Sequence, residues 1–345
     1  MTEIGSEFYY TDEAEPIFGC SVGGLLDHCG ALYLDSGRSA IQHFYRAFVS
    51  PRRMLMPAYC CHSMLQGLPP DKIGFYDINE DLGLDTDSLF SKLGDDVGAL
   101  LFVNYFGFLQ PPHVMRALEK VKHAGVLILE DTTHSIFTSF RTAGGYCVCS
   151  LRKWFALPDG GAFYPTGGPA GYPENEALFT LRDRAMRLKS GYIKNGGEKK
   201  PYQTLFMQGE TLLDTQSEPR AMTRASCALL ARQGTEIIRG RRRRNFLCLQ
   251  RSLPRSVTPV KRLDDDRTVP MFFPVYCERR GELAGILREQ GIYCPVHWPA
   301  FAHSGLAECT GARRIRENIL SLPIDQRYDE SDMARMASAI ADAGV

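Results

Sequence analysis

Two segments of this 345-residue chain combine side chains that could do chemistry together. The segment EDTTH (130–134) follows an apolar run, and a carboxylate such as Asp131 at the tip of a buried strand calls for a cation opposite it. Lys153 follows Ser150 by three residues and has aromatic and apolar neighbours in SLRKWFAL (150–157). An amine in such surroundings is a candidate nucleophile.

A third segment, SGRSA (36–40), could bind an anion, because a turn into a helix presents free backbone N–H groups to phosphate. Each feature alone has an ordinary explanation, since a strand-end Asp or a Ser-Gly turn often only caps a helix and most lysines lie at the surface. Together they meet the needs of pyridoxal 5'-phosphate (PLP). Its phosphate needs N–H and hydroxyl donors, its pyridine nitrogen needs a carboxylate, and its aldehyde needs an amine.

The elements that must position these segments alternate between short apolar strands and helices from residue 30 to about 165. The runs at 97–107 and 125–131 are almost wholly apolar, which is typical of strands buried on both faces of a parallel sheet. The helix expected between them, over 112–124, fits a right-handed crossover. We therefore expect an α/β fold with a mostly parallel central sheet and helices on both faces. The other elements expected here are a helix over 36–48, strands over 52–59 and 72–78, and a helix over 85–93.

The C-terminal part has a different organisation. Long helices are expected from 176 to about 250, and they include the basic run RGRRRRN (239–245), which we interpret as a solvated helix face or a hinge because the whole chain is neutral. A smaller α+β unit follows. Its expected elements are strands over 268–277 and 292–298 and helices over 280–291 and 329–343. We predict a large cofactor-binding domain over 1–245 and a small domain over 246–345.

Composition narrows the classes of partner. Lys plus Arg and Asp plus Glu each number 40, so the formal net charge is zero, and neither nucleic acid nor a membrane is expected as a partner. No apolar run approaches the ~20 residues of a membrane span, and the stretch 1–16 is acidic where a signal peptide is basic and then apolar. These features predict a cytoplasmic protein. The eleven cysteines form no CxxC pair and accompany no histidine cluster, so we expect reduced thiols and no metal site.

From about residue 33 to the C-terminus, the sequence resembles the DegT-type sugar aminotransferases, which are fold type I enzymes that use PLP. The matching motifs, in collinear order, are SGRSAI (36–41), MPAYCCHS (56–63), VNYFGF (103–108), LEDTTHS (129–135), SLRKWFALPDGGAFY (150–164) and NILSLPIDQRYDESDMARM (318–336). The lysine and Glu-Asp segments are specific, although the Ser-to-Lys spacing is shorter than in the most familiar members. The resemblance implies a fold type I aminotransferase architecture with a smaller C-terminal α+β domain.

The resemblance implies a role for each matched side chain. Lys153 would bind the cofactor as a Schiff base and, once released, move a proton between the substrate carbon and the cofactor. Asp131 would pair with the pyridinium nitrogen, and His134 matches the residue expected near the pyridoxal phenolic oxygen. The phosphate cradle would comprise four residues. These are Gly37, Arg38, Ser39 and Ser150, of which Arg38 replaces a threonine and adds charge.

Two segments depart from the family pattern. The family stacks an aromatic residue on the cofactor ring after the strand that here ends in MPAYCCHS. Ungapped matching places Cys61 there, flanked by Tyr59 and His62, so all three are candidates for contact with the cofactor. The family segment that reaches the phosphate of the neighbouring subunit has no clear match in LLDTQSEPRAMT (212–223).

The resemblance implies an aminotransferase that moves an amino group, from glutamate, onto a keto sugar carried by a nucleotide, in amino-sugar or surface-polysaccharide biosynthesis. A homodimer with a shared active site is expected. Candidate substrate contacts are Tyr105 in VNYFGF and the pair His297 and Trp298 in PVHWP, although Trp298 fits a core position equally well.

Several alternatives stay open at this point. Another PLP reaction, such as sugar dehydration, is disfavoured because family members of that type replace the lysine with histidine. A non-catalytic relative that binds PLP or sugar would be a second possibility, although no DNA-binding segment accompanies the chain. A nicotinamide-binding fold would need a G-x-G-x-x-G segment, which is absent. A thiol nucleophile at Cys60, Cys61, Cys147 or Cys149 lacks a histidine partner in sequence.

Overall fold

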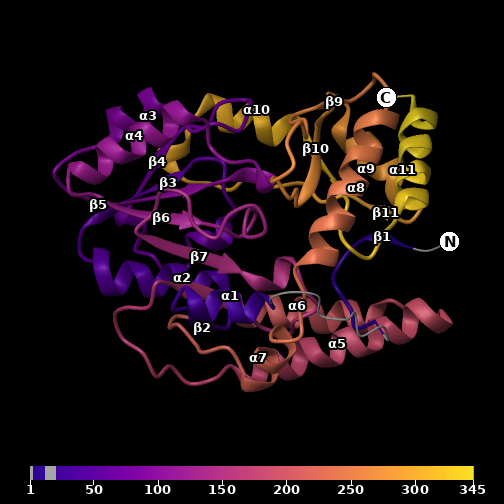
Figure 1. The fold of residues 1–345 in the computed structure, drawn as a ribbon, viewed down its shortest axis with the longest axis horizontal. Helices are drawn as coiled ribbons and strands as arrows, with labels where there is room; N and C mark the ends of the chain where they lie inside the picture. Colours follow the sequence, from indigo (N-terminus) through magenta and orange to yellow (C-terminus); the bar gives the residue numbers. More distant parts are fainter. Residues whose placement is uncertain (1–2, 12–20, 345) are drawn as a thin grey trace.

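The computed structural model describes residues 3–11 and 21–344 and confirms a mixed α/β fold with a mostly parallel central sheet (Figure 1). The seven strands of this sheet are β2 (Leu32–Leu34), β3 (Arg53–Pro57), β4 (Ile73–Tyr76), β5 (Val97–Val103), β6 (Leu127–Asp131), β7 (Tyr146–Ser150) and β8 (Gly161–Tyr164). Their order is β2-β8-β7-β6-β5-β3-β4. The strands from β4 to β7 pair in parallel, whereas β8 is antiparallel to both β7 and β2.

The predicted elements of this region are confirmed, with boundaries that shift by a few residues. All seven residues of β5 are buried, as its continuous apolar sequence predicts. Helix α2 begins where the Ser36 hydroxyl accepts a hydrogen bond from Ser39 N–H, and it continues as a π-helical turn over Tyr45–Val49. The helices of this region are α1 (Val22–His28), α2 (Gly37–Phe44), α3 (Thr86–Lys92) and α4 (Pro112–His123).

A smaller α+β unit follows in sequence. It contains the sheet β12-β10-β9, with β9 (Thr258–Pro259), β10 (Phe272–Tyr276) and β12 (Ile319–Pro323), and helices α9 (Arg280–Glu289), α10 (Thr310–Asn318) and α11 (Glu330–Ala343). The strand predicted over 292–298 is too long, because β11 comprises only Ile292–Tyr293. It pairs in parallel with β1 (Ile4–Gly5), so the N-terminal strand lies in this small unit. Pro295 has no N–H to extend a ladder, and its carbonyl accepts from Ser321 N–H instead.

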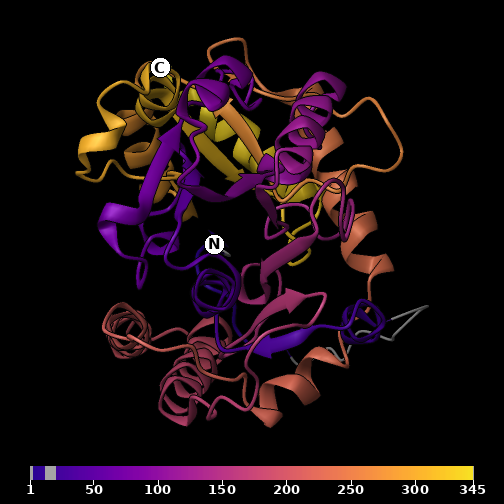
Figure 2. The same cartoon turned by 90° about the vertical axis from the view of Figure 1, so that its left-hand side faces the viewer.

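Four helices connect the two units, as the sequence predicts for residues 176–250. They are α5 (Glu176–Asn195), α6 (Lys200–Asp214), α7 (Arg224–Leu230) and α8 (Glu236–Ser252). The predicted domain boundary at 245 falls inside α8. Figures 1 and 2 show α5 and α6 below the small unit and at the level of the lower edge of the large sheet, where β2 lies. No helix of the described residues combines the length and apolar character needed to cross a membrane.

The direction of the strands decides where ligand-binding groups gather. The arrows of β6 and β7 point toward the small unit in Figure 1, so the carboxyl ends of the parallel strands face it. Ligands of open α/β sheets bind outside these ends. The ten cysteines in the described part of the chain are free thiols, and Cys20 lies outside the described residues.

Candidate active site

Lys153 projects into a cavity between the sheet and the small unit. It ends a 3-10 turn, Leu151–Lys153, directly after β7. The cavity has a volume of about 420 Å³ and is lined by Lys153, by residues 5–8 of the N-terminal segment and by residues of the small unit that include His297. Lys153 is exposed to this space and makes no hydrogen bond or ion pair with a described residue. Its amine is therefore available to a ligand.

Thr133 connects the two segments that the sequence singled out. Its N–H donates to Asp131 Oδ1 at 2.8 Å, and its hydroxyl accepts from Ser150 N–H at 2.9 Å. Its carbonyl accepts from the indole Nε1 of Trp154, next to Lys153, at 2.6 Å. These three hydrogen bonds fix the end of β6 against the end of β7. The strand-end carboxylate and the lysine turn are thereby held together.

The adjacent carboxylates of β6 have opposite environments, because successive side chains of a strand point to opposite faces. Glu130 accepts hydrogen bonds from Asn104 Nδ2, Thr142 N–H and the Thr142 hydroxyl, all within 3.0 Å. Asp131 is buried, and within the described residues its hydrogen bonds come from Thr133 alone and no cation lies within 4 Å. Burial raises the pKa of Asp131 to about 6. The hydrogen bonds from Thr133 lower this pKa, but they offset only part of the effect of burial. Asp131 thus lacks the cation that its position calls for.

His134 is held as a neutral imidazole. Its Nδ1 accepts a hydrogen bond from Phe106 N–H at 3.1 Å, so the proton resides on Nε2. Burial, with a smaller contribution from Lys153, lowers the pKa of His134 to about 3. The ring stacks on Trp298 at a centroid distance of 5.4 Å and meets His297 edge-on at 5.8 Å. The predicted residues His134, His297 and Trp298 are therefore one cluster, and His297 and Lys153 line the same cavity.

The start of α2 faces Ser150 closely. A Cβ atom added to Gly37 would lie 3.1 Å from Ser150 Cβ, and one added to Gly161 would lie 2.3 Å from the backbone of Ser36. Gly161 is therefore required for this approach, whereas a side chain at position 37 would demand a small shift of Ser150. The N–H groups of Gly37 and Arg38 and the hydroxyl of Ser150 make no hydrogen bond with a described residue. These three donors are available to an anion.

The side chains of Arg38 and Ser39 are already engaged. Arg38 forms ion pairs with Glu210 and Asp214 of α6, so the positive charge that it adds near the cradle is largely compensated. The Ser39 hydroxyl is buried, donates to Asp35 Oδ1 at 2.6 Å and accepts from Gln216. It stabilises the turn rather than pointing outward.

Glu210 is the centre of a charge cluster that the sequence analysis did not identify. Besides Arg38, it accepts hydrogen bonds from Arg152 at 3.0 Å and Arg182 at 2.9 Å. Burial by itself would raise the pKa of Glu210, but Arg152, Arg182, Lys153 and Arg38 together hold it well below its usual range. Arg182 also pairs with Glu7 of the N-terminal segment at 3.4 Å. No local motif marks Glu210, because its partners are distant in sequence.

The residues expected around the cofactor ring differ in accessibility. Tyr59 is buried and its hydroxyl donates to the carbonyl of His297. Tyr105 is also buried and donates to the carbonyl of Tyr59 at 2.5 Å. Cys61 is partly exposed, and His62 is exposed and packs against Phe301 at a centroid distance of 5.1 Å. The hydroxyls of Tyr59 and Tyr105 are therefore already bonded to backbone carbonyls, and both side chains are packed in the core.

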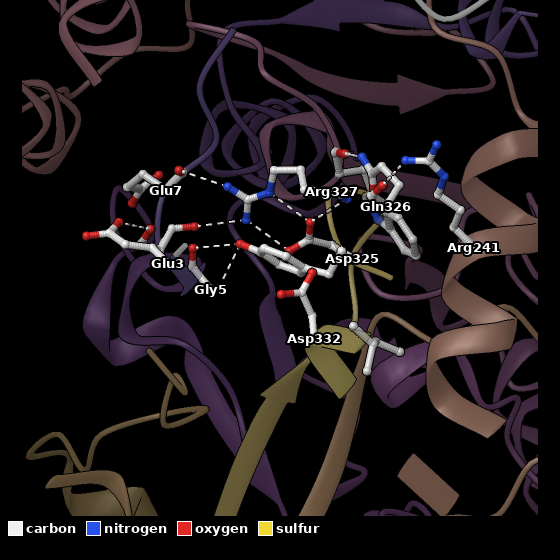
Figure 3. A network of polar contacts seen from close by, with 12 residues as sticks. Glu3, Gly5, Glu7, Arg241, Asp325, Gln326, Arg327 and Asp332 are labelled. Carbon is white, nitrogen blue, oxygen red and sulfur yellow. Dashed lines mark hydrogen bonds and ion pairs between the residues drawn. The ribbon is translucent and has the colours of Figure 1, made fainter. Parts of the chain in front are cut away.

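The N-terminal segment forms one wall of the cavity and is anchored by Arg327 (Figure 3). Arg327 pairs with Asp325 at 2.8 Å and donates to the carbonyls of Ser6 and Glu7, both at 3.2 Å. Its guanidinium also lies 4.3 Å from the ring centroid of Phe8. These contacts tie the first described residues to the small unit.

The interpretation of RGRRRRN as a solvated face or hinge is wrong for most of the run. The segment lies inside α8, and Arg242 is 1% exposed and lines the cavity. Arg239 and Arg243 donate to backbone carbonyls of other segments, and Arg244 alone is exposed among the arginines. Neutral overall charge gave no information about burial at single positions.

Comparisons with known proteins agree with this geometry. Residues 71–341 match the DegT/DnrJ/EryC1/StrS aminotransferase family. No curated protein matches the sequence significantly. Many solved structures share the fold, and three of them illustrate the similarity. DesV of S. venezuelae, in complex with a ketimine intermediate, has 20% identity and a TM-score of 0.66 over 95% of this chain and 91% of that one. PseC of Helicobacter pylori has 15% identity and a TM-score of 0.69 over 99% of each chain. DesI, solved with its TDP-sugar product, has 17% identity and a TM-score of 0.63 over 92% of this chain and 82% of that one.

The residues present fit the cofactor of this family, PLP. Asp131 offers a carboxylate with no cation beside it, Lys153 offers a free amine, and the start of α2 with Ser150 offers unpaired donors. These groups correspond to the pyridine nitrogen, the aldehyde and the phosphate. The chain belongs to the DegT/DnrJ/EryC1/StrS aminotransferase family and is a PLP-dependent aminotransferase.

Proposed function

We propose that this protein transfers an amino group from glutamate to a keto sugar carried by a nucleotide, in amino-sugar or surface-polysaccharide biosynthesis. The observation that carries the proposal is the free Lys153 amine in a cavity, on a turn that Thr133 holds against the end of β6, where Asp131 is a buried carboxylate without a cation. Two proteins of similar structure support sugar chemistry. DesI was solved with its TDP-sugar product, and PseC is described as acting in pseudoaminic acid biosynthesis.

In this proposal Lys153 binds the cofactor and then moves a proton. PLP supplies a ring that withdraws electrons from the substrate carbon. Lys153 Nζ would hold the cofactor through its aldehyde and, once released, would take the proton from the substrate carbon. A free, unpaired amine suits this work, because no ion pair must be broken first.

Asp131 would keep the pyridine nitrogen protonated, and His134 would donate to the phenolic oxygen. A pyridinium held by Asp131 would supply the missing cation and would favour the carboxylate over its protonated form. His134 suits its role because the Phe106 N–H occupies Nδ1 and leaves the Nε2 proton for a ligand. Its neutrality avoids placing a second cation near Lys153.

The phosphate would be held by the N–H groups of Gly37 and Arg38 and by the hydroxyl of Ser150. Ser39 acts through the turn that it stabilises, and the Arg38 side chain acts through its pairing with Glu210. Three residues are candidates for contact with the cofactor ring. Cys61 is partly exposed, whereas Tyr59 is buried and His62 is exposed and packs against Phe301.

For the substrate, His297 is the candidate contact that lines the cavity, and its Nδ1 is fixed by Ser321 at 2.7 Å. Trp298 packs against His297, and Tyr105 packs against Trp298.

We also propose a homodimer in the cytoplasm. Met207 of α6 and Leu188 of α5 are 64% and 41% exposed, so these neighbouring helices present apolar side chains that a second copy would cover. The free thiols of the described cysteines suit a reducing compartment.

Reaction with L-glutamate tests the proposed function. The purified enzyme loaded with PLP should change from the visible absorption of the lysine-bound cofactor to that of its amine form when L-glutamate is added, and should release 2-oxoglutarate. Addition of a nucleotide-linked keto sugar should then restore the first spectrum and yield an amino sugar. A sugar that loses water without gaining nitrogen would indicate a dehydratase, and no spectral response to any L-amino acid would contradict the proposal.

A further inference from the structure

Five cationic side chains line the cavity, and most of them are compensated. They are Arg152, Lys153, Arg242, Arg288 and Arg327. Arg152 pairs with Glu210 and Arg327 with Asp325. Arg288 is exposed to water, and the lysine is reserved for the cofactor.

Arg242 differs from the other four. It is 1% exposed, and among the described residues no carboxylate lies within 4 Å of it. Its Nε donates to the amide oxygen of Gln326 at 3.0 Å and its Nη1 to the carbonyl of Met271 at 2.7 Å, and both acceptors are neutral. Burial lowers its pKa to about 10, although Asp325 acts in the opposite direction. A buried guanidinium without a counter-charge is costly, so an anionic ligand is the partner that its surroundings lack.

The position of Arg242 relates it to the reacting amine. Its guanidinium carbon lies 4.2 Å from the ring centroid of Trp154, the residue that follows Lys153. Gln326 holds both residues, because its amide oxygen accepts from Arg242 and its amide nitrogen donates to the Trp154 carbonyl. The remaining guanidinium nitrogen of Arg242, Nη2, makes no hydrogen bond with a described residue. Arg242 is thus fixed at the wall of the cavity that Lys153 enters.

We propose that Arg242 binds the α-carboxylate of the amino-acid donor, an inference that rests on the proposed function. The α-carboxylate is attached to the carbon that bears the reacting amine, so it must lie near Lys153. The phosphates of a nucleotide sugar lie several bonds from the carbon that is aminated and reach farther from the lysine. A guanidinium also matches a carboxylate with two parallel hydrogen bonds.

This role confines Arg242 to one half of the reaction. The amino acid and the oxo acid formed from it both carry the α-carboxylate, whereas a keto sugar does not. Arg242 therefore selects amino acids over plain amines as donors, and the same space receives sugar hydroxyls in the second half-reaction. Its replacement should weaken the donor half-reaction without displacing the cofactor.

Variants of the PLP-loaded enzyme test the inference, with Arg243→Gln as the matched control. Arg243 belongs to the same helix and also donates to two backbone carbonyls, but it does not line the cavity. We expect Arg242→Gln to lower kcat/KM for L-glutamate in the half-reaction about 100-fold. Calorimetry should show a similar loss of affinity for 2-oxoglutarate. Arg242→Lys should recover part of both losses, and Arg243→Gln should stay within about twofold of the wild type.

The outcomes separate this inference from the proposed function. Equal reactivity of Arg242→Gln and the wild type with glutamate would overturn the inference alone. Loss of cofactor absorption or of melting temperature in Arg242→Gln, matched by Arg243→Gln, would assign Arg242 a structural role and also overturn it. A wild-type enzyme that reacts with no L-amino acid would overturn the proposed function and the inference together.

Discussion

Two charged regions that meet at Lys153 differ in how completely their charges are compensated. In the Glu210 cluster, each carboxylate has at least one arginine within 3.4 Å, and Glu210 has three. On the other side, Asp131 and Arg242 are buried, yet no described group of opposite charge lies within 4 Å of either. Both regions contain hydrogen bonds to charged side chains, and they differ in whether the opposite charge is present.

The comparison distinguishes architecture from function. A compensated cluster stabilises the fold by itself and links α2, α5 and α6 to the lysine turn. An uncompensated buried charge costs stability in the absence of a ligand and recovers that cost when the ligand binds. A buried carboxylate thus stabilises the fold in the Glu210 cluster and destabilises it at Asp131. Substitution of each carboxylate should reveal this difference in stability.

The largest expected effect is that of Asp131→Asn, which should improve the fold while damaging the enzyme. Loss of the carboxylate beside the pyridine nitrogen should lower kcat roughly 10³-fold in steady-state assays. In the cofactor-free protein, the folded pKa of about 6 exceeds the ordinary aspartate pKa of 3.8 in the unfolded chain, so stability is lost as pH rises between these values. At pH ~7 the substitution should therefore raise the free energy of unfolding, by up to about 3 kcal/mol.

Urea unfolding of the cofactor-free protein provides the control for Asp131→Asn. At a pH of about 3 the carboxyl is protonated in both states, and the gain in stability should vanish. A variant that is less stable than the wild type at neutral pH would show that Asp131 is compensated after all.

Glu210→Gln should have the opposite effect, with a moderate magnitude. Arg38, Arg152 and Arg182 would lose their shared carboxylate, and the free energy of unfolding should fall by about 1–3 kcal/mol. The Glu210 side chain is 40% exposed, so water compensates part of the loss. Because the folded pKa is lowered, the difference from the wild type should shrink as pH falls below about 4. An unchanged midpoint in urea at neutral pH would remove the structural role assigned to the cluster.

The smallest effect is expected for Glu130→Gln, the neighbour of Asp131 on the opposite face. The two carboxylate oxygens accept from different donors, so the new amide nitrogen would face either Asn104 Nδ2 or Thr142 N–H, at a cost of about 1–2 kcal/mol of stability. The kcat should change less than tenfold, since Glu130 points away from the cofactor side. A loss of activity as large as that of Asp131→Asn would contradict the assignment of the two faces.

Local sequence patterns were sufficient to predict the central sheet and the positions of Lys153 and Asp131. Continuous apolar strands such as β5 and the turn after them are local features, so their motifs could be recognised. The hydrogen bonds of Thr133 to both Asp131 and Ser150 depend on the parallel pairing of β6 with β7. The sequence predicts a mostly parallel sheet but not the register of this pair. The strand after residue 292 was predicted too long because its apolar residues continue past the short pairing with β1.

Long-range pairing limits prediction of the charged groups. Glu210 meets Arg38 across 172 positions, and nothing in its own segment marks it. Arg242 belongs to a run of basic residues whose members have different environments, because a helix turns about 100° per residue. The position of each residue around the helix thus determines that Arg242 is buried and Arg244 exposed, and the composition of the run does not predict this difference.

The most direct test of the central claim is to locate the cofactor on the chain. The enzyme incubated with PLP and reduced with borohydride should lose its visible band, and peptide mass spectrometry should find the reduced pyridoxyl group on Lys153. Lys153→Ala should bind no covalent cofactor under the same conditions. Attachment at a different lysine, or an unmodified Lys153 in an active enzyme, would contradict the account.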